Sequence, residues 1–314
     1  MATTSTTTTT TSTNPRRTVL ITGSSSGFGL ALTRHFLSGP SNWNVIATSR
    51  NPQRTPDLVA EVEASGRGAW LQLDVCDPQS KIDEVIAQAG GLFHGAGIDV
   101  VFNNAGYSVL GVVETIDEEA ARKQMDANFW GTLKVCKAVI PGLRERGRGG
   151  WIVNFSSIAG LMAGMTCGVY AGSKFAVEGL TESLAQEIAP FNISTLLVEP
   201  GMFQTNFFNE SNAMNLAPLP AHYRGTAAEE QHTKFANAGK ATLRGDVDKA
   251  AARVREVVEG KLVLEGSSGE GSVKRLILGP DAFGRAVNTL GGKLEEVRRQ
   301  EEISGSTDRD DFDG

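Results

Sequence analysis

Short, continuously apolar runs alternate along this chain with longer segments in which apolar residues recur every three or four positions. Continuous apolar runs are typical of strands buried on both faces of a sheet, and the longer period is typical of amphipathic helices. The runs that predict strands are residues 18–22, 43–49, 69–75, 98–106, 151–157, 193–201 and 273–279. The segments that predict helices end near residue 36 or cover about 78–89, 118–146, 170–188 and 281–300.

This alternation predicts an α/β fold built from βαβ units. Because crossovers between parallel strands are right-handed and place helices on the faces of the sheet, we expect a doubly wound parallel sheet of about seven strands in a Rossmann-type order. Residues 16–300 would form this single domain. We expect a lid-like insertion over the carboxyl edge of the sheet at about 202–240, where periodicity is poor and Asn, Pro and Ala are frequent.

Both ends of the chain are predicted to be disordered tails. Residues 1–15 are rich in Thr and residues 301–314 are acidic, and neither segment has enough apolar residues to pack into a core. The N-terminal tail also lacks the apolar stretch of a secretory signal, and no apolar run reaches the length of a transmembrane helix. We therefore expect a cytoplasmic protein.

The composition narrows the classes of function. Of the 314 residues, 40% are hydrophobic and 21% are charged, with a net charge of −6 and no cluster of Lys and Arg. This balance favours neither nucleic acid nor an anionic membrane surface as a partner. The three cysteines are far apart and the four histidines lack ligand spacing, so we expect reduced thiols and no metal site. Cys167 is expected to line a pocket or to lie buried.

A glycine-rich turn follows the first predicted strand and opens the first predicted helix. The sequence TGSSSGFG places Gly23, Gly27 and Gly29 there, with residues 24–26 as serine hydroxyl donors. Glycines permit positive φ angles and close approach of a ligand to the backbone, and a helix N-terminus attracts anions. The strand before the turn and the helix after it therefore predict a site for the diphosphate of a dinucleotide.

The end of the second predicted strand indicates which dinucleotide is bound. NAD-binding domains usually carry Asp or Glu there to bond the ribose hydroxyls, whereas a nearby Arg suits a 2′-phosphate. Here the sequence reads ATSRNPQR, with no acid and with Arg50 directly after the strand. A guanidinium pairs with a phosphate that a carboxylate would repel. We predict NADP(H) rather than NAD(H); the alternative is that Arg50 is a solvated surface residue.

Tyr170 and Lys174 are four residues apart at the start of a predicted helix, so their side chains share one face. A cationic ammonium near a phenol favours the phenolate and is expected to lower the pKa of Tyr170 toward neutrality. Val177 and Thr181 continue this face. A separate apolar stripe is expected to pack inward and to anchor the helix, namely Ala176, Leu180, Leu184 and Ile188.

Several stretches together resemble the short-chain dehydrogenases/reductases, of the type with a Tyr-x3-Lys pair and a Gly-x3-Gly-x-Gly loop. They are TGSSSGFG (22–29), LDV (73–75), NNAG (103–106), IVNFSS (152–157), YAGSK (170–174) and PGMFQT (200–205), in the order and spacing of the family. The resemblance covers residues 17–205 and is loose beyond them. It implies a Rossmann-type domain and hydride transfer between a nicotinamide cofactor and a carbonyl or alcohol group.

The resemblance also implies roles for single residues. Tyr170 would be the catalytic acid or base, and Lys174 its partner and a ligand of the nicotinamide ribose. Ser157, rather than Ser156, would bind the substrate oxygen. Asn128 would complete a tetrad by supporting a water chain to Lys174; the alternative is an ordinary interior amide. The cofactor would contact Gly23, Ser25, Ser26, Gly27, Phe28 and Gly29 in the glycine-rich turn, Arg50, Asp74, Val75, Asn104, Ala105 and Gly106 on the adenosine side, and Tyr170, Lys174, Pro200, Gly201, Phe203 and Thr205 on the nicotinamide side.

These residues predict an NADPH-dependent oxidoreductase that acts on a carbonyl compound or a secondary alcohol. Residues 158–169 and 207–220 are apolar and contain Met, which indicates a hydrophobic ketone that is steroid-, polyketide- or lipid-like. Two alternatives remain open: a non-catalytic NADP(H)-binding regulatory protein, and a nucleotide-linked isomerase or dehydratase on the same fold. The resemblance also implies a homodimer or homotetramer paired through residues 118–146 and 171–188.

Overall fold

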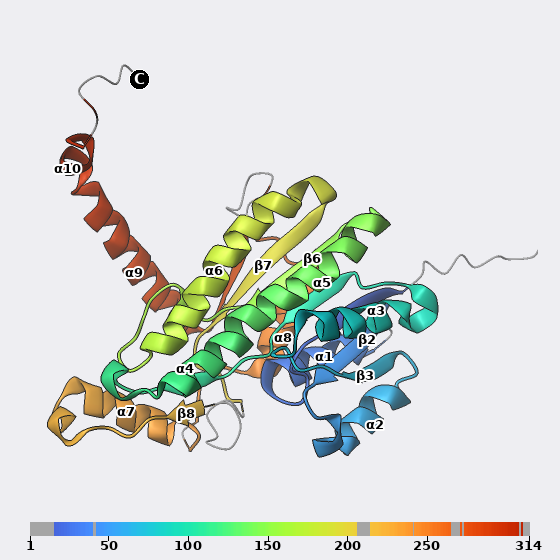
Figure 1. Cartoon of the computed structure of the whole chain (residues 1–314), viewed down its shortest axis with the longest axis horizontal. Coiled ribbons are helices and arrows are strands. Elements are labelled where there is room, and N and C mark those ends of the chain that lie inside the picture. Colours follow the sequence, from blue (N-terminus) through green and yellow to red (C-terminus); the bar gives the residue numbers. More distant parts are fainter. Residues whose placement is uncertain are drawn as a thin grey trace, which may run out of the picture.

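Seven parallel strands form the central sheet in the order β3-β2-β1-β4-β6-β7-β9 (Figure 1). The structure is a computed structural model and describes residues 16–39, 42–205, 214–240, 242–264, 271, 273–307 and 309. Each strand coincides with one predicted apolar run, so the predicted doubly wound α/β sheet is confirmed. The strands are β1 (Arg17–Ile21), β2 (Trp43–Ser49), β3 (Gly68–Gln72), β4 (Val100–Asn103), β6 (Gly150–Phe155), β7 (Ile193–Pro200) and β9 (Lys274–Leu278).

The order of the strands reverses at β1, which lies between β2 and β4. Leu20 of β1 is opposite Ile46 on one side and Val101 on the other. Connections that leave two neighbouring strands in opposite directions create a crevice outside their carboxyl ends, where open α/β sheets bind ligands. The glycine-rich turn after β1 and the segment after β4 border this crevice.

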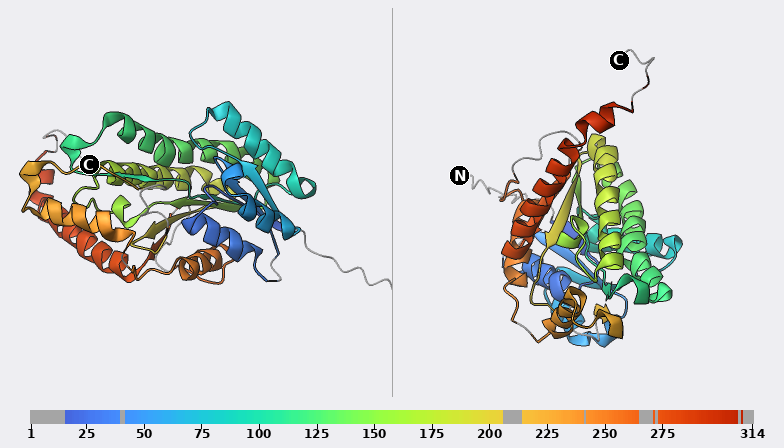
Figure 2. Two further views of the ribbon diagram at one scale, coloured as in Figure 1. Left: turned by 90° about the horizontal axis from the view of Figure 1, so that it is seen from below. Right: turned by 90° about the vertical axis from the view of Figure 1, so that its left-hand side faces the viewer.

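Helices cover both faces of the sheet (Figure 2). On one face lie α1 (Gly27–Leu37) and α8 (Val247–Val258), and on the other lie α3 (Gln79–Gly95), α5 (Gly131–Arg146) and α6 (Gly168–Ile188). Each layer buries its own hydrophobic core against the strands. The central strands are therefore buried on both sides of the sheet.

Helices α2 (Pro56–Ala64) and α8 were not predicted. Helix α2 buries only Val62 and packs at the edge of the sheet, so its sequence shows a weak apolar stripe. Helix α8 could have been predicted from an N-terminal capping residue and the apolar residues that follow it. The side chain of Asp246 caps it by accepting hydrogen bonds from the backbone of residues 248 and 249, and a regular apolar stripe follows.

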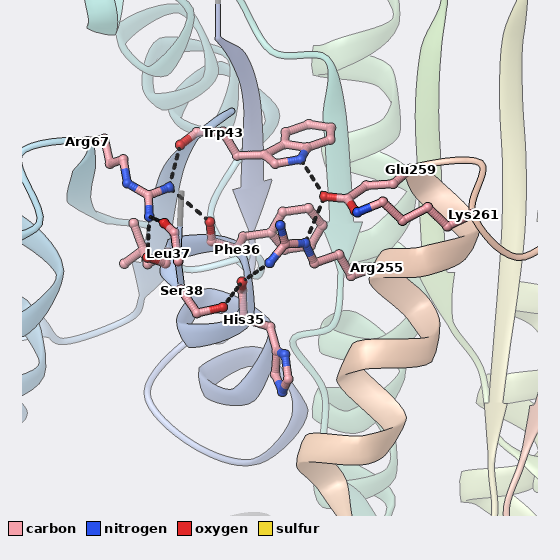
Figure 3. Close-up of polar contacts among 10 residues, drawn as sticks. His35, Phe36, Leu37, Ser38, Trp43, Arg67, Arg255, Glu259 and Lys261 are labelled. Carbon is pink, nitrogen blue, oxygen red and sulfur yellow. Dashed lines mark hydrogen bonds and ion pairs between the residues drawn. The ribbon is translucent and has the colours of Figure 1, made fainter. Parts of the chain in front are cut away.

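A polar network fixes α8 onto α1 and β2 (Figure 3). The indole of Trp43 donates a hydrogen bond of 2.9 Å to Glu259, and Arg255 donates one of 2.8 Å to the same carboxylate. Arg255 also donates to the carbonyl of His35, and Arg67 donates to the carbonyls of Phe36 and Leu37. These carbonyls lie in the last turn of α1, where the two guanidinium groups add hydrogen bonds to them, and the His35 carbonyl also accepts one of 2.8 Å from the hydroxyl of Ser38.

Residues 118–146, predicted as one helix, form α4 (Glu118–Met125) and α5 with a π-helical turn between them (Asp126–Trp130). Such turns insert one extra residue into a helix and are frequent at functional sites. Asn128 lies in the middle of this turn and is buried.

The expected insertion after residue 202 contains a strand and a helix. β8 (Met214–Leu216) pairs in parallel with β5 (Ser108–Leu110), and α7 (Ala227–Ala238) follows. Residues 206–213 and 241 lie outside the described part of the chain. The pairing of β8 with β5 brings the insertion close to the carboxyl end of β4, and its role as a lid stays a prediction.

The chain after β9 forms α9 (Pro280–Arg298) and the short α10 (Glu301–Gly305). The expectation of disorder from residue 301 onward is therefore wrong for residues 301–305. Two glutamates in the first turn of α10 interact favourably with the positive end of the helix dipole, which favours helix there. The N-terminal tail, residues 1–15, and the last residues of the acidic tail lie outside the described residues.

Candidate active site

The structure brings the four predicted catalytic side chains together at the carboxyl edge of the sheet. Ser157 follows β6, Tyr170 and Lys174 lie in the first turns of α6, and Asn128 comes from the π-helical turn. The hydroxyl groups of Ser157 and Tyr170 are hydrogen-bonded, and Lys174 Nζ lies 5.8 Å from the centre of the Tyr170 ring. Asn128 reaches α6 through a hydrogen bond of 3.0 Å to Ser173.

Ser157 is held from two sides. Its hydroxyl accepts a hydrogen bond of 3.1 Å from the backbone of Ala159 and donates one of 3.4 Å to the carbonyl of Pro200 at the end of β7. Ser156, by contrast, is buried, and its hydroxyl has no hydrogen-bond partner among the described residues. Only Ser157 is hydrogen-bonded to Tyr170, which supports the preference for it over Ser156.

The expectation that the pKa of Tyr170 is lowered toward neutrality is wrong. Burial raises the pKa of the Tyr170 phenol to about 12, against the opposing effect of the Ser157 hydrogen bond. The ammonium of Lys174 lies over the face of the ring and donates a hydrogen bond of 2.8 Å to the carbonyl of Phe155. Removal from water therefore outweighs the hydrogen bond from Ser157, and the phenol keeps its proton at neutral pH.

Lys174 is itself nearly removed from water. Burial lowers the pKa of its ammonium to about 8, and the carboxylate of Glu178, one helical turn further along α6, acts in the opposite direction. The buried ammonium keeps a hydrogen-bond partner in the Phe155 carbonyl. Its charge is therefore sensitive to small electrostatic changes near neutral pH.

Replacing Lys174 by Met should change how stability depends on pH. The folded protein without cofactor releases the Lys174 proton near pH 8, whereas the unfolded chain keeps it up to about 10.5. The unfolded state binds more protons between these values, so the free energy of unfolding contributed by this group rises with pH across that window. Below pH 8 the buried charge costs on the order of 1–3 kcal/mol, which Lys174→Met removes.

Urea unfolding of both proteins, below pH 8 and near pH 10.5, measures this effect. The stability of Lys174→Met relative to the wild type should fall as the pH rises through the window. A difference that stays constant with pH would contradict a buried, titrating ammonium at this position.

The buried face of α6 differs from the expected one. We predicted an inward stripe separate from the face of the reactive pair, but Lys174, Val177 and Thr181 lie on the buried face themselves. Ala176 and Leu180 are only half-buried. The reason is that α6 is covered by the sheet on one side and by the π-helical turn on the other, so the reactive side chains and the core side chains share one face.

The amide of Asn128 is fully engaged within the protein. Its oxygen accepts a hydrogen bond of 3.0 Å from the backbone of Tyr107, and its nitrogen donates to the carbonyl of Tyr107 (2.9 Å) and to Ser173 (3.0 Å). Asn128 thus ties the segment after β4 to α6. These bonds are those of the interior amide that we considered as the alternative, and a water chain toward Lys174 stays a prediction.

The glycine-rich turn has the shape required to hold a diphosphate. Gly23 has a φ of +71°, and a Cβ placed on Gly29 would lie 2.2 Å from the carbonyl oxygen of Gly23. The side chain of Ser26 does not cap α1, and no acidic residue occupies its first turn. A helix N-terminus without a cap or a carboxylate favours an anion, so the residues present fit a dinucleotide here.

Ser24 corrects one detail of this turn. Its hydroxyl is fully buried and donates a hydrogen bond of 3.0 Å to the carbonyl of Ile21, so it is not available to a phosphate. Ser25 and Ser26 remain partly exposed. The side chain of Asn104 also serves the turn, because it donates to the carbonyls of Thr22 (2.8 Å) and Gly23 (3.2 Å).

The predicted adenosine-side residues lie around the crevice beyond β2 and β3. Arg50 is exposed at the end of β2, close enough to Tyr107 that its charge opposes the rise in the pKa of Tyr107 caused by burial. Asp74 accepts a hydrogen bond of 3.0 Å from the backbone of Cys76. Val75 is buried beneath Gly131, where a Cβ would lie 2.8 Å from it. Ala105 and Gly106 follow Asn104 after β4.

The predicted nicotinamide-side loop, residues 200–205, folds back over the glycine-rich turn. A Cβ placed on Gly27 would lie 3.6 Å from the Cβ of Thr205. The rings of Phe28 and Phe203 are 5.1 Å apart, and Phe28 is 5.5 Å from Phe155. The side chains of Phe28 and Phe203 therefore hold the two loops together by apolar contact.

Sequence reasoning missed three residues that shape the site, Tyr107, Ser173 and Asp281. Asp281 accepts a hydrogen bond of 3.0 Å from the backbone of Met202, and its carboxylate would lie 2.4 Å from a Cβ on Gly201. The available signal was an Asp in the first turn of a helix directly after a strand. Tyr107 acts through its backbone, which leaves no signal in the side chain.

Apolar residues surround the Tyr170 ring. Leu110, Cys167 and Met214 are buried beside it, and Leu216 and Phe235 of the insertion pack against them. Cys167 is buried as expected, and burial raises the pKa of its thiol to about 11, so the thiol stays protonated. Two of these elements, β8 and α7, belong to the insertion, which therefore covers Tyr170.

The family model for the short chain dehydrogenases matches residues 17–216, so the chain belongs to this family. It is 40% identical over 201 residues to a 3-ketodihydrosphingosine reductase of Bacteroides thetaiotaomicron, covering 63% of this chain and 68% of that protein. It is also 40% identical over 220 residues to human retinol dehydrogenase 8, covering 69% of this chain and 67% of that protein.

Solved structures agree with this assignment. A short-chain dehydrogenase from Streptomyces avermitilis aligns with a TM-score of 0.77 and 32% identity, over 93% of this chain and 100% of that one. ElxO with NADP bound aligns with a TM-score of 0.62 and 25% identity, over 83% and 97%. The protein is therefore an oxidoreductase that acts on alcohol or carbonyl groups with a nicotinamide cofactor. Within the described residues, no helix combines the length and apolar character needed to cross a bilayer.

Proposed function

We propose that the protein is an NADP(H)-dependent reductase of an apolar, lipid-like ketone, or the dehydrogenase of the corresponding secondary alcohol. The observation that carries this proposal is the Tyr170 phenol, hydrogen-bonded to Ser157 and surrounded by apolar side chains of the insertion. A proton donor at the base of an apolar site suits a carbonyl group on a hydrophobic molecule.

The cofactor would be held by the glycine-rich turn, Arg50, the segment after β4 and the loop after β7. When bound, its nicotinamide supplies the hydride for reduction or accepts it in the reverse reaction. Thr205 and Gly27, from two of the loops that would hold the cofactor, lie near each other, since a Cβ placed on Gly27 would be 3.6 Å from the Cβ of Thr205.

The chain's own residues would handle the substrate oxygen. Ser157 would donate a hydrogen bond to it, and Tyr170 would donate the proton that the developing alkoxide requires. A phenol whose pKa is raised to about 12 keeps its proton at neutral pH, which favours the donor role and hence the reductive direction. The ammonium of Lys174 would stabilise the phenolate that remains after proton donation.

Arg50 supports NADP(H) over NAD(H). It is exposed directly after β2, where no acidic residue stands to bond the ribose hydroxyls. The solved structure of ElxO, similar in fold, holds NADP. A 2′-phosphate would give the exposed guanidinium a partner.

Exchanging Arg50 for Glu should reverse the cofactor preference. The KM for NADPH is expected to rise about ten- to hundredfold, because a charge-assisted pair of about 1.5–3 kcal/mol is lost. The KM for NADH should fall or stay unchanged, since a carboxylate bonds ribose hydroxyls. Steady-state kinetics with both cofactors measures this, with Arg299→Glu, an exposed residue at the end of α9, as control. Equal effects on both cofactors would argue for a solvated Arg50.

The substrate class is tested by turnover. Purified protein with NADPH should reduce long-chain or isoprenoid ketones and aldehydes faster than short polar ones. The rate of each reaction is measured from the decrease in NADPH absorbance. The relatives named 3-ketodihydrosphingosine reductase and retinol dehydrogenase 8 suggest both compound types for the panel. Cofactor binding without turnover of any compound would support the regulatory alternative. Substrate conversion without net cofactor oxidation would support the isomerase or dehydratase alternative.

A further inference from the structure

Two buried acidic side chains lie directly behind the reactive pair. Glu199 on β7 is completely buried, and Glu178 on α6 is 6% exposed. Both carboxylates form ion pairs with the same nitrogen of Arg275 on β9, Nη1. Two buried carboxylates that share one guanidinium nitrogen lie close together, and like charges at such a site favour one proton shared between them.

The surroundings of the two carboxylates also favour a hydrogen-bond donor between them. One oxygen of each carboxylate, Glu178 Oε1 and Glu199 Oε2, has no hydrogen-bond partner among the described residues. The packing there is tight, since a Cβ on Gly160 would lie 2.9 Å from Glu178 Oε1 and 2.3 Å from the hydroxyl of Ser156. An unpaired buried carboxylate oxygen is costly, and a shared proton removes that cost.

We propose that Glu178 and Glu199 share one proton and that this carboxyl pair, bound by Arg275, positions Lys174 and Ser157 in the candidate active site. The two residues are positioning residues in this proposal, not groups that touch the substrate. The part that concerns Lys174 and Ser157 as catalytic groups rests on the proposed function.

Glu178 is linked to Lys174, and Glu199 is linked to Ser157. Glu178 lies one turn after Lys174 on α6, and its carboxylate opposes the fall in the pKa of Lys174 that burial causes. Glu199 directly precedes Pro200, whose carbonyl accepts the hydrogen bond of Ser157. The pair therefore links the helix that carries the ammonium to the strand that holds the serine.

The charges around the pair are nearly balanced. With one shared proton the pair carries a single negative charge, opposite the single positive charge of Arg275. Lys174 and Glu182 on α6 are the other charged groups nearby, and Glu182 also pairs with Arg275 at the exposed end of the cluster. Burial and the neighbouring Glu178 carboxylate together raise the pKa of Glu199 to about 7, against the opposing effect of Arg275. Loss of the shared proton near neutral pH thus adds a negative charge close to Lys174.

Glu178→Gln tests the effect on Lys174. The alkaline limb of the kcat/KM profile should move to lower pH by about one unit, because a carboxylate that stabilises the ammonium is lost. Glu182→Gln removes the more exposed partner of the same arginine and should leave the limb in place. A purely structural role for Glu178 would lower the melting temperature without moving the limb. An unmoved limb would overturn the proposal.

A second readout does not depend on turnover. The free energy of unfolding of the protein without cofactor rises with pH once folded Lys174 releases its proton, near pH 8. In Glu178→Gln this rise should begin about one pH unit lower. If no carbonyl compound is turned over, the proposed function fails while this measurement still decides whether Glu178 acts on Lys174.

Glu199→Gln tests the shared proton. The folded wild type keeps this proton up to about pH 7, whereas an unfolded glutamate releases it near 4.5, so the contribution of this group to stability falls as the pH rises from 4.5 to 7. Gln supplies a permanent N–H donor and cannot lose a proton, so its stability relative to the wild type should grow across that window. The stability of Glu182→Gln should depend on pH in the same way as that of the wild type. If the stability of Glu199→Gln also followed the pH dependence of the wild type, this result would contradict the shared proton.

Discussion

The Tyr170→Phe variant is expected to lose at least about a hundredfold in kcat, since a positioned acid or base contributes about 10²- to 10⁴-fold. The substitution keeps the ring packed beside Leu110 and Cys167 and removes only the hydroxyl with its hydrogen bond to Ser157. Because a single hydrogen bond contributes about 1 kcal/mol to stability, the variant should remain folded. Cofactor binding should persist, since the glycine-rich turn and Arg50 are untouched.

Steady-state kinetics with NADPH and the best ketone of the panel, together with calorimetric binding of NADPH, measures both quantities. Tyr223→Phe is a matched control, because Tyr223 lies in the short helix of residues 221–223 and is not among the residues packed beside Tyr170. Undiminished turnover of Tyr170→Phe would show that another group donates the proton. Loss of both turnover and NADPH binding would instead indicate that the ring position supports the cofactor site.

The Gly29→Ala variant should be destabilised and should lose its response to cofactor. Its Cβ would lie 2.2 Å from the carbonyl oxygen of Gly23 and 2.6 Å from the Asn104 amide. Neither the backbone nor this hydrogen-bonded amide can move away at low energetic cost. Forcing an atom into such a space typically costs about 1–3 kcal/mol. The turn would have to open, so the backbone donors that would hold a diphosphate would move apart.

Thermal unfolding with and without NADP+ measures both effects for this variant. Gly142→Ala on α5 is the control, because an added Cβ there meets no atom within 4 Å and should stabilise the helix by about 0.5–1 kcal/mol. A Gly29→Ala protein with wild-type stability and a full cofactor-induced shift in melting temperature would contradict the compact turn described above.

The strands were predictable because burial on both faces requires uninterrupted apolar runs, and all seven appear in the sequence at the right places. The helices were less predictable where burial is slight. Helix α2 buries only Val62, so its stripe is too weak to read. The kind of helix was also hidden, since nothing in residues 118–146 distinguishes the π-helical turn around Asn128 from ordinary helix.

The types of reactive group at the site follow from local sequence. Local spacing alone places Tyr170 and Lys174 one turn apart and sets three glycines between a strand and a helix. The behaviour of those groups depends on the folded protein, because the free energy of a charge depends on what surrounds it. Burial raises the pKa of Tyr170 where the sequence suggested a fall, and it pairs Glu178 with Glu199 and Arg275 from three distant segments. No local pattern encodes these contacts, since strand order and helix packing bring them about.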